Sequence, residues 1–431
     1  MRPLITFLVL CLTTGLFAQE VLTAEEAVRL AVERNYGIRL ARLDAKGAEL
    51  LNTPGLAGML PNLDAVGAYT IDNSSTKQTF FSGEVREADN ADARVLDAAV
   101  QLNWTVFDGL TMFATKDRLE ALELIGQTQL RQRIEATVYE VLSTYYQLVQ
   151  LRKGISLQRE VMRISQERLT IAEAGQRIGT ASGLAVVQAR LDLSTDSAAV
   201  MDLLLRDAES ASRLNTLMAR DPATPLAVAP EIPPIAPMDR AQLNEQSLQA
   251  NSVLQQARQQ QIAADLHVQE LRGDMLPRLD VFANYGYTRS SSAVGFLQSN
   301  QSLGPDMGAR LSIPLFHGGQ QRTARDVAQL QREQAALTTE QVALNLQESL
   351  LNAWNTHTTA LQREALELEQ LTGARTQVDV ALESYRLGVL TALELRDVQV
   401  GYLAAEQRLL VARYEAKVSE LQLKWLAGRL L

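Results

Sequence analysis

The residues that could carry chemistry are few and mostly charged. His267, His317 and His357 are widely separated and do not have the spacing of metal ligands. No nucleophile stands beside a base in a catalytic motif, and the sequence has no glycine-rich loop of the kind that holds phosphate. We therefore expect no enzymatic activity, no metal site and no cofactor.

Two carboxylates near the end of the chain are spaced to share a helix face. Glu394 and Asp397 are three residues apart, so a helix would place both side chains on one side. Such a pair either belongs to a solvated helix face or attracts cations to an opening. The sequence pattern alone favours the solvated face.

Two short motifs with a glycine lie at corresponding places in the chain. Arg177-Ile-Gly179 is matched by Arg386-Leu-Gly388. Glycine allows the backbone to reverse between antiparallel helices. The arginines either cap helix C-termini through their charge or contribute to a binding surface, and both interpretations remain open.

The elements that must position these residues come from an internal duplication. The stretch Met59–Asp64 is nearly the same as Met275–Asp280, and Leu102–Gly109 resembles Leu311–Gly318. Each copy predicts a helix, two strands, a very long helix, a tight tip and a returning helix. A duplication of this length means that the fold is built from two copies of one structural unit.

Periodicity, turn residues and prolines give the expected boundaries of both repeats. Repeat one covers 19–219, with a helix over 23–56, strands over 62–71 and 94–107, a long helix over 109–177, a tip over 178–183 and a helix over 184–219. Repeat two covers 241–431, with a helix over 241–274, strands over 278–288 and 307–316, a long helix over 318–386, a tip over 387–391 and a helix over 392–427. The polar stretch 72–93 predicts a loop, and the Pro-rich stretch 220–240 predicts a connector between the repeats.

The long helical stretches are free of proline. None of the twelve prolines lies within 62–221 or 315–431, which permits unbroken helices. Each long helix would span roughly 100 Å, and the two shorter helices of its repeat together match that length. Leu337, Leu344 and Leu351 recur every seven residues, which is typical of packed helices.

The N-terminus reads as a secretory signal over residues 1–18. A positive start precedes a short apolar run, and cleavage is expected after Ala18. Cys11, the single cysteine, lies inside this segment, so the mature chain would have no disulfide. Beyond it, no apolar run is long enough for a transmembrane helix. The net charge of −9 argues against nucleic acid as a partner.

The strands have one apolar face and suit a membrane. In 94–107 the apolar residues alternate with polar ones, as in Leu102 and Trp104 against Asn103 and Thr105. A tilted bilayer-spanning strand needs about 9–11 residues. Ordinary strands packed on a soluble core are the alternative, but the helices are too long and polar to wrap a small sheet. A sheet in lipid must close, so four strands per chain imply an oligomer of two copies or more.

Taken together, the repeated motifs resemble those of a known family. The start Leu22–Ala31, the Leu-Pro strand entries at Pro61 and Pro277, the Phe-Asp-Gly and Phe-His-Gly strand exits, and the Arg-x-Gly tips together are similar to TolC and the outer-membrane efflux proteins. The order, duplication and spacing of these motifs cover essentially the whole mature chain.

The resemblance implies an α+β membrane protein in the outer membrane of a Gram-negative bacterium, with a large periplasmic extension. It would be a homotrimer, built of a tandem repeat of long α-hairpins forming a coiled-coil α-barrel, with four β-strands per chain in an oligomeric transmembrane β-barrel. It would serve as the exit duct of a tripartite efflux or type I secretion system, with a periplasmic adaptor and, indirectly, an inner-membrane pump as partners. The tips that would dock the adaptor are Arg177, Gly179, Thr180, Arg386, Gly388 and Val389.

The resemblance also implies a gate at the periplasmic entrance. Glu394 and Asp397 match acidic residues that form a ring there in the family, and Tyr385 matches the tyrosine of a latch. Leu390 stands where the family's latch has an arginine, and Glu394 replaces an aspartate, so that latch is in doubt for this chain. Tyr385 also fits the heptad pattern of the helix seam.

One alternative of a different class stays open from the sequence. The chain could be a soluble periplasmic coiled-coil scaffold or tether without a pore. The exported substrate is not encoded in any motif, because a duct selects mainly through the pump it serves.

Overall fold

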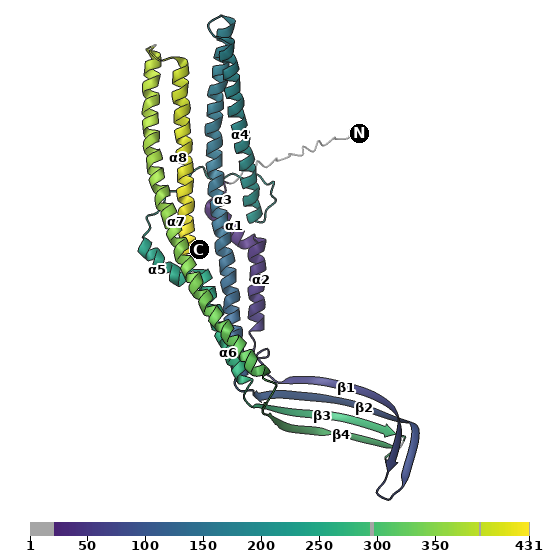
Figure 1. Ribbon diagram of the computed structural model, residues 1–431. Coiled ribbons are helices and arrows are strands. Elements are labelled where there is room, and N and C mark those ends of the chain that lie inside the picture. Colours follow the sequence, from purple (N-terminus) through teal and green to yellow (C-terminus); the bar gives the residue numbers. More distant parts are fainter. Residues whose placement is uncertain (1–20, 294–296, 388, 431) are drawn as a thin grey trace, which may run out of the picture. The chain divides into compact units, whose positions relative to one another are not determined.

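The computed structural model describes residues 21–293, 297–387 and 389–430 (Figure 1). The predicted signal sequence and Gly388 lie outside the described residues. In chain order the elements are α1 (Ala24–Arg34), α2 (Tyr36–Leu51), β1 (Asn62–Thr79), β2 (Val85–Phe107), α3 (Thr111–Arg177), α4 (Gly183–Leu217), α5 (Arg240–Ala250), α6 (Ser252–Gly273), β3 (Arg278–Ser292), β4 (Ser299–Ser312), α7 (Gln320–Arg386) and α8 (Ala392–Leu426).

Two compact units divide the chain and cut across the two repeats. Unit 1 comprises Met1–Leu40, Arg131–Asn251 and Asn345–Leu431, and unit 2 comprises Ala41–Leu130 and Ser252–Leu344. Each unit therefore combines elements of both repeats. The long helices α3 and α7 contribute to both units.

The sheet of unit 2 has four antiparallel strands in the order β1-β2-β3-β4 (Figure 1). Rows across the sheet alternate in chemistry, as strand pleating requires. One row consists of Leu63, Leu102, Ala283 and Met307, and the next consists of Asp64, Gln101, Asn284 and Asp306. The sheet thus has one apolar and one polar face. Within the described chain, β1 and β4 each have one strand neighbour, so both are edges.

The first hairpin is much longer than the sequence pattern indicated. The prediction of a loop over 72–93 was wrong, because β1 and β2 continue through this stretch and meet at the turn 80–84. Asp72 pairs with Ala93, and pairing resumes after a register shift between Ser74 and Thr76. Backbone pairing does not need apolar side chains, so a polar composition did not reveal these strand ends.

The second hairpin is also displaced from its predicted bounds. β3 extends to Ser292 instead of ending at 288, and β4 covers Ser299–Ser312 instead of 307–316. Pro314 cannot donate to a strand ladder, and β4 ends before it. Pro305 lies within β4 opposite Tyr285, which an edge strand tolerates. Pro61 directly precedes β1, and Pro277 directly precedes β3.

Each helix that precedes a hairpin is broken once, contrary to prediction. The expected helix 23–56 separates into α1 and α2 at Asn35, whose φ and ψ are −53° and 126°. The Asn35 Oδ1 atom accepts hydrogen bonds from the Gly37 and Ile38 amides at 2.8 and 3.2 Å, which is an N-cap for α2. The expected helix 241–274 breaks in the same way at Asn251, with φ −63° and ψ 121°.

The long helices begin after tight turns and then run without a break. Gly109 and Leu110 have positive φ before α3, and Gly318 and Gly319 have positive φ before α7. Each helix therefore starts two residues later than predicted. A side chain at Gly109 would clash with the carbonyl oxygen of Gly273, so glycine is required there. Within the described part of the chain, no helix is both long and apolar enough to cross a membrane.

Candidate functional site at the hairpin tips

The first tip joins α3 to α4 within unit 1 (Figure 1). Arg177 is the last residue of α3, and Gly179 has φ +80°. The Thr180 amide donates to the Gly175 carbonyl at 2.8 Å, which closes the helix end in a Schellman-type turn. Ser182 then caps α4 by accepting from the Ala185 amide at 3.2 Å.

The second tip joins α7 to α8 and has the same backbone pattern. The Val389 amide donates to the Ser384 carbonyl at 2.9 Å, which corresponds to the bond made by Thr180. Thr391 caps α8. The two tips thus present equivalent turns, although Gly388 itself lies outside the described residues.

The tip arginines do not cap the helix ends in this structure. The Arg386 Nη1 atom donates to Glu383 at 2.7 Å, and both side chains are exposed. The Arg177 side chain is exposed and makes no hydrogen bond or ion pair with any described residue. Both guanidinium groups are therefore accessible to a ligand or partner, as a docking role requires.

Exposed apolar side chains surround the tip residues, and sequence reasoning missed them. Ile178 and Leu184 flank the first tip, and Leu387 and Val389 lie at the second. Of these, only Val389 was among the predicted docking residues. All four side chains are largely exposed, and large apolar residues at an exposed helix reversal were the signal that could have identified them.

The predicted gate residue Glu394 also has a structural role. Its carboxylate accepts from the Thr391 amide at 2.9 Å and from the Thr391 hydroxyl at 2.7 Å. Together with the Thr391 cap, this is a capping box. These two donors hold the pKa of Glu394 below its usual value, the backbone amide having the larger effect. The charge of Glu394 is therefore well maintained at neutral pH.

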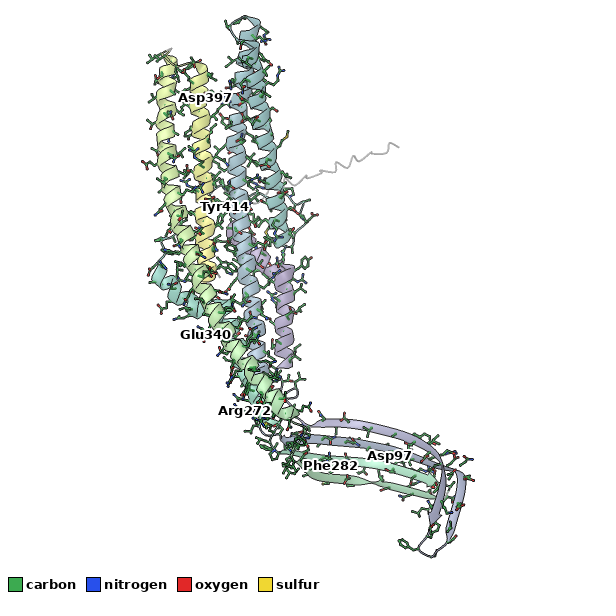
Figure 2. The ribbon with its side chains drawn as sticks, viewed as in Figure 1. Asp97, Arg272, Phe282, Glu340, Asp397 and Tyr414 are labelled. Atoms are coloured by element: carbon green, nitrogen blue, oxygen red, sulfur yellow. The ribbon has the colours of Figure 1, made fainter. Side chains whose placement is uncertain are left out.

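Asp397 lies one turn further along α8, near the tip (Figure 2). Its side chain is exposed, and its Oδ1 atom lies 3.4 Å from the Arg396 Nη1 atom. Glu394 and Asp397 are both exposed, three residues apart on one helix. The Tyr385 side chain is also exposed, at the end of α7, and makes no hydrogen bond with any described residue.

A polar network behind the tips links the two hairpins of unit 1. The Arg396 Nη2 atom of α8 donates to the Ser165 hydroxyl of α3 at 3.0 Å, and that hydroxyl donates to Asp196 of α4. Ser165 is buried, and so is the Arg396 Nε atom, which has no partner among the described residues. Sequence reasoning missed this contact because its three residues come from distant helices.

Comparison with known proteins agrees with this architecture. The sequence model of the family described as "Outer membrane efflux protein" matches residues 27–220 and 243–429. Alkaline protease secretion protein AprF of Pseudomonas aeruginosa is 25% identical, over 99% of this chain and 89% of AprF. Protein CyaE of Bordetella pertussis is 26% identical, over 94% of this chain and 84% of CyaE.

The solved structures show the fold. The outer membrane channel CmeC of Campylobacter jejuni superimposes with a TM-score of 0.81 at 15% identity, covering 94% of this chain and 85% of CmeC. The predicted fold of long helical hairpins with four antiparallel strands is confirmed by this match and by the observed sheet order.

Proposed function

The chain belongs to the outer membrane efflux protein family, and on that premise we propose that it forms a homotrimeric exit duct. Members of this family are outer-membrane channels with a periplasmic helical domain, and they are not enzymes. The duct would conduct substrates passively from a periplasmic adaptor and an inner-membrane pump to the exterior. It would serve a tripartite efflux or type I secretion system.

The open sheet carries this proposal. Its apolar face suits lipid and its polar face suits a water-filled interior. An open edge in lipid leaves backbone groups without hydrogen-bond partners, which costs several kcal/mol per group. β1 and β4 are such edges. Three copies would close twelve strands into one barrel, above the roughly eight strands of the smallest barrels.

The hairpin tips support an adaptor as partner. The tips combine exposed apolar side chains with exposed guanidinium groups. Exposed apolar patches bordered by polar groups mark interaction sites, and arginine is enriched at protein interfaces. The proposed docking residues are Arg177, Gly179, Thr180, Arg386, Gly388 and Val389. Gly388→Trp should abolish export while leaving trimer assembly intact, because the bulk is added only at the docking surface. Unchanged substrate tolerance in cells carrying this variant would refute the docking role.

Glu394 and Asp397 support a cation-attracting entrance. In a trimer they would place six carboxylates around the periplasmic opening, which raises the local concentration of cations. Their exposure and the lowered pKa of Glu394 fit this role. Tyr385 has no arginine partner in the latch position, since Leu390 occupies it. We therefore assign the gate to the two carboxylates rather than to that latch.

A direct experiment separates the duct from a soluble scaffold. A closed barrel should require detergent for extraction and migrate differently on a gel before and after heating. Native mass measurement of the detergent-solubilised protein should give three copies. A protein that remains in solution without detergent after signal removal, with no heat-dependent migration, would instead be the scaffold.

A further inference from the structure

We propose that the groove between α5 and α7 in unit 1 is the docking site for an extended apolar segment of a separate periplasmic protein. In the first repeat the equivalent place is covered by a segment of this chain, and in the second repeat no described residue takes that position. The inference goes beyond the proposed duct, because it concerns contacts within unit 1 of one chain and would hold equally for a scaffold.

The helices of the two repeats align without gaps in unit 1. Asn251 lies 216 residues after Asn35, so α5 is the mate of α1, and both helices contain 11 residues. Arg386 lies 209 residues after Arg177, so α7 and α8 are the mates of α3 and α4. Both long helices contain 67 residues, and both returning helices contain 35. Each of these helical positions therefore has one mate in the other repeat.

In the first repeat a segment of the Pro-rich connector lies along the start of α1. The Leu22 amide donates to the Ala227 carbonyl at 2.8 Å, and Leu22 and Val228 form a parallel β-bridge. The Tyr145 hydroxyl of α3 donates to the Leu22 carbonyl at 2.9 Å and accepts from the Ala229 amide at 3.1 Å. The connector is thus held through its backbone, as in the addition of a strand.

The side chains of this segment, residues 226–232, complete a hydrophobic core, and we call the segment the strap. Leu226 is buried in the core, and Val228 and Ile232 pack against it. Their even spacing places these three side chains on one side of an extended chain. The helices contribute four further buried members of the same core, Ala27 and Ala31 of α1 and Val141 and Tyr145 of α3. The strap therefore covers the seam between α1 and α3.

In the second repeat the same seam is open. The mates of Ala27, Ala31, Val141 and Tyr145 are Leu243, Ser247, Leu350 and Trp354. These four mates line a cavity of about 400 Å³ between α5 and α7, which lie next to one another in Figure 1. The hydrophobic core that contains Leu243 and Leu350 has no described counterpart of the strap side chains. A cavity of this size is within the range of ligand pockets.

The backbone that would receive an occupant has an unused donor. Met238 is the mate of Leu22, and it precedes the α5 cap Asp239 as Leu22 precedes the α1 cap Thr23. The Leu22 amide is bonded to the strap, whereas the Met238 amide donates to no described residue. A second hollow, of about 300 Å³, is lined by Met238 and also by Leu243 of the cavity floor. The free amide and the floor therefore belong to one groove.

The floor of the groove is apolar, and its rim is polar and basic. Leu243 and Leu350 are 4% and 3% exposed, whereas Leu248 at the edge is 36% exposed. Arg240 is the one charged side chain among the described residues that line the cavity, and it makes no ion pair with any of the described residues. An extended segment with apolar side chains on one side and an acidic side chain for Arg240 complements this surface.

The occupant is a segment of another protein rather than of a second copy. The strap of every copy is already held in its own first repeat through Leu22 and Tyr145, so no copy has this segment free. The helical domain of the family lies in the periplasm, so the partner must be a periplasmic protein. The strap still serves as a model of its chemistry, because Glu231 stands between the apolar residues Val228 and Ile232.

A peptide with the sequence of residues 224–234 is the probe for this groove. Labelled with a fluorophore, it should bind the purified full-length protein in detergent and gain anisotropy, whereas a scrambled peptide should not. Leu248→Asp should weaken binding about tenfold, because apolar side chains would have to lie against a charge. Val253→Asp makes the same kind of change at an exposed apolar residue of α6 outside the groove and should bind like the wild type. Absence of binding, or equal binding by both variants, would overturn the site.

A charge exchange tests the contact with Arg240. Arg240→Glu should weaken binding of the strap peptide about fivefold, which is the upper range for an exposed ion pair. A Glu231→Lys peptide should bind this variant more tightly than it binds the wild type. A variant that weakens both peptides alike would show a disturbed groove and would overturn the pairing of Arg240 with an acidic side chain.

Photocrosslinking identifies the source of the natural occupant. A photoreactive amino acid in place of Leu248 should link the chain to another protein in isolated outer membranes, and excess strap peptide, but not the scrambled peptide, should prevent the link. The same group in place of Val253 is the control and should give no link that the peptide prevents. Links only between copies of this chain would overturn the separate partner, and so would a link that the strap peptide leaves unchanged.

Discussion

Asn35 donates a hydrogen bond from its Nδ2 atom to the carbonyl oxygen of Leu217 at 2.8 Å. Leu217 is the last residue of the returning helix α4, and Asn35 marks the break between α1 and α2. The second repeat has the same relationship, since Asn251 donates to the carbonyl of Leu426 at 3.0 Å. One buried amide therefore ends one helix, starts another and holds the end of a third.

Replacing Asn35 by alanine should destabilise this junction by about 2 kcal/mol. The change removes an N-cap, worth about 1 kcal/mol, and a hydrogen bond to a buried carbonyl, worth about another. Hydrogen exchange of the Gly37 and Ile38 amides should accelerate by about thirtyfold. Asn352→Ala, at an exposed position inside α7, is the control and should change little. Equal effects of both changes would contradict the capping role.

A charge at the second tip should impair adaptor docking. Val389→Asp replaces an exposed apolar side chain by a carboxylate, and binding of the adaptor would have to remove water from that charge. We expect export to fall at least tenfold while the trimer remains intact. Val380→Asp makes the same change at an exposed valine inside α7, away from the tip, and should leave export near the wild-type level. Equal export by both variants would argue against docking at the tip.

The entrance carboxylates should control divalent-cation block of single-channel current. Glu394→Ala with Asp397→Ala should weaken the block, but Glu394→Ala also removes a capping box. Glu394→Gln with Asp397→Asn is therefore the cleaner variant, because Gln retains the reciprocal bond of the box. We expect the blocking concentration to rise about tenfold. A block unaltered in both double variants would count against the ring.

The same block should persist as the pH falls through the usual glutamate range. The Thr391 donors lower the pKa of Glu394, so its carboxylate stays charged until the pH falls below that range. The capping box accordingly contributes stability above the ordinary pKa of glutamate and loses it as pH falls through the lowered value. Recording block against pH checks this. Loss of block in wild type already at the ordinary pKa would contradict it.

Much of the fold could be predicted from the sequence because repeated motifs mark structural events. Pro61 and Pro277 precede strands, and Arg177 and Arg386 end the long helices. Each of these positions has a local physical cause, such as a missing amide donor or a reversal of the backbone. Such positions can therefore be recognised from the neighbouring residues in the sequence.

The features that were missed depend on distant partners. Asn35 within a helical pattern looks ordinary until the carbonyl of Leu217 is beside it. Arg396, Ser165 and Asp196 meet only because three helices pack together. The outer halves of β1 and β2 are paired through their backbones, so their polar side chains carried no strand signal.

The inner strand pairs of the sheet and its two edges face different entropic demands. β2 and β3 belong to one chain, so they are never diluted away from one another. In the proposed oligomer, β1 and β4 must find a partner on another molecule, and that contact must first overcome the loss of free translation and rotation of a whole chain. Closure of the sheet would therefore depend on protein concentration, whereas the pairing of β2 with β3 would not.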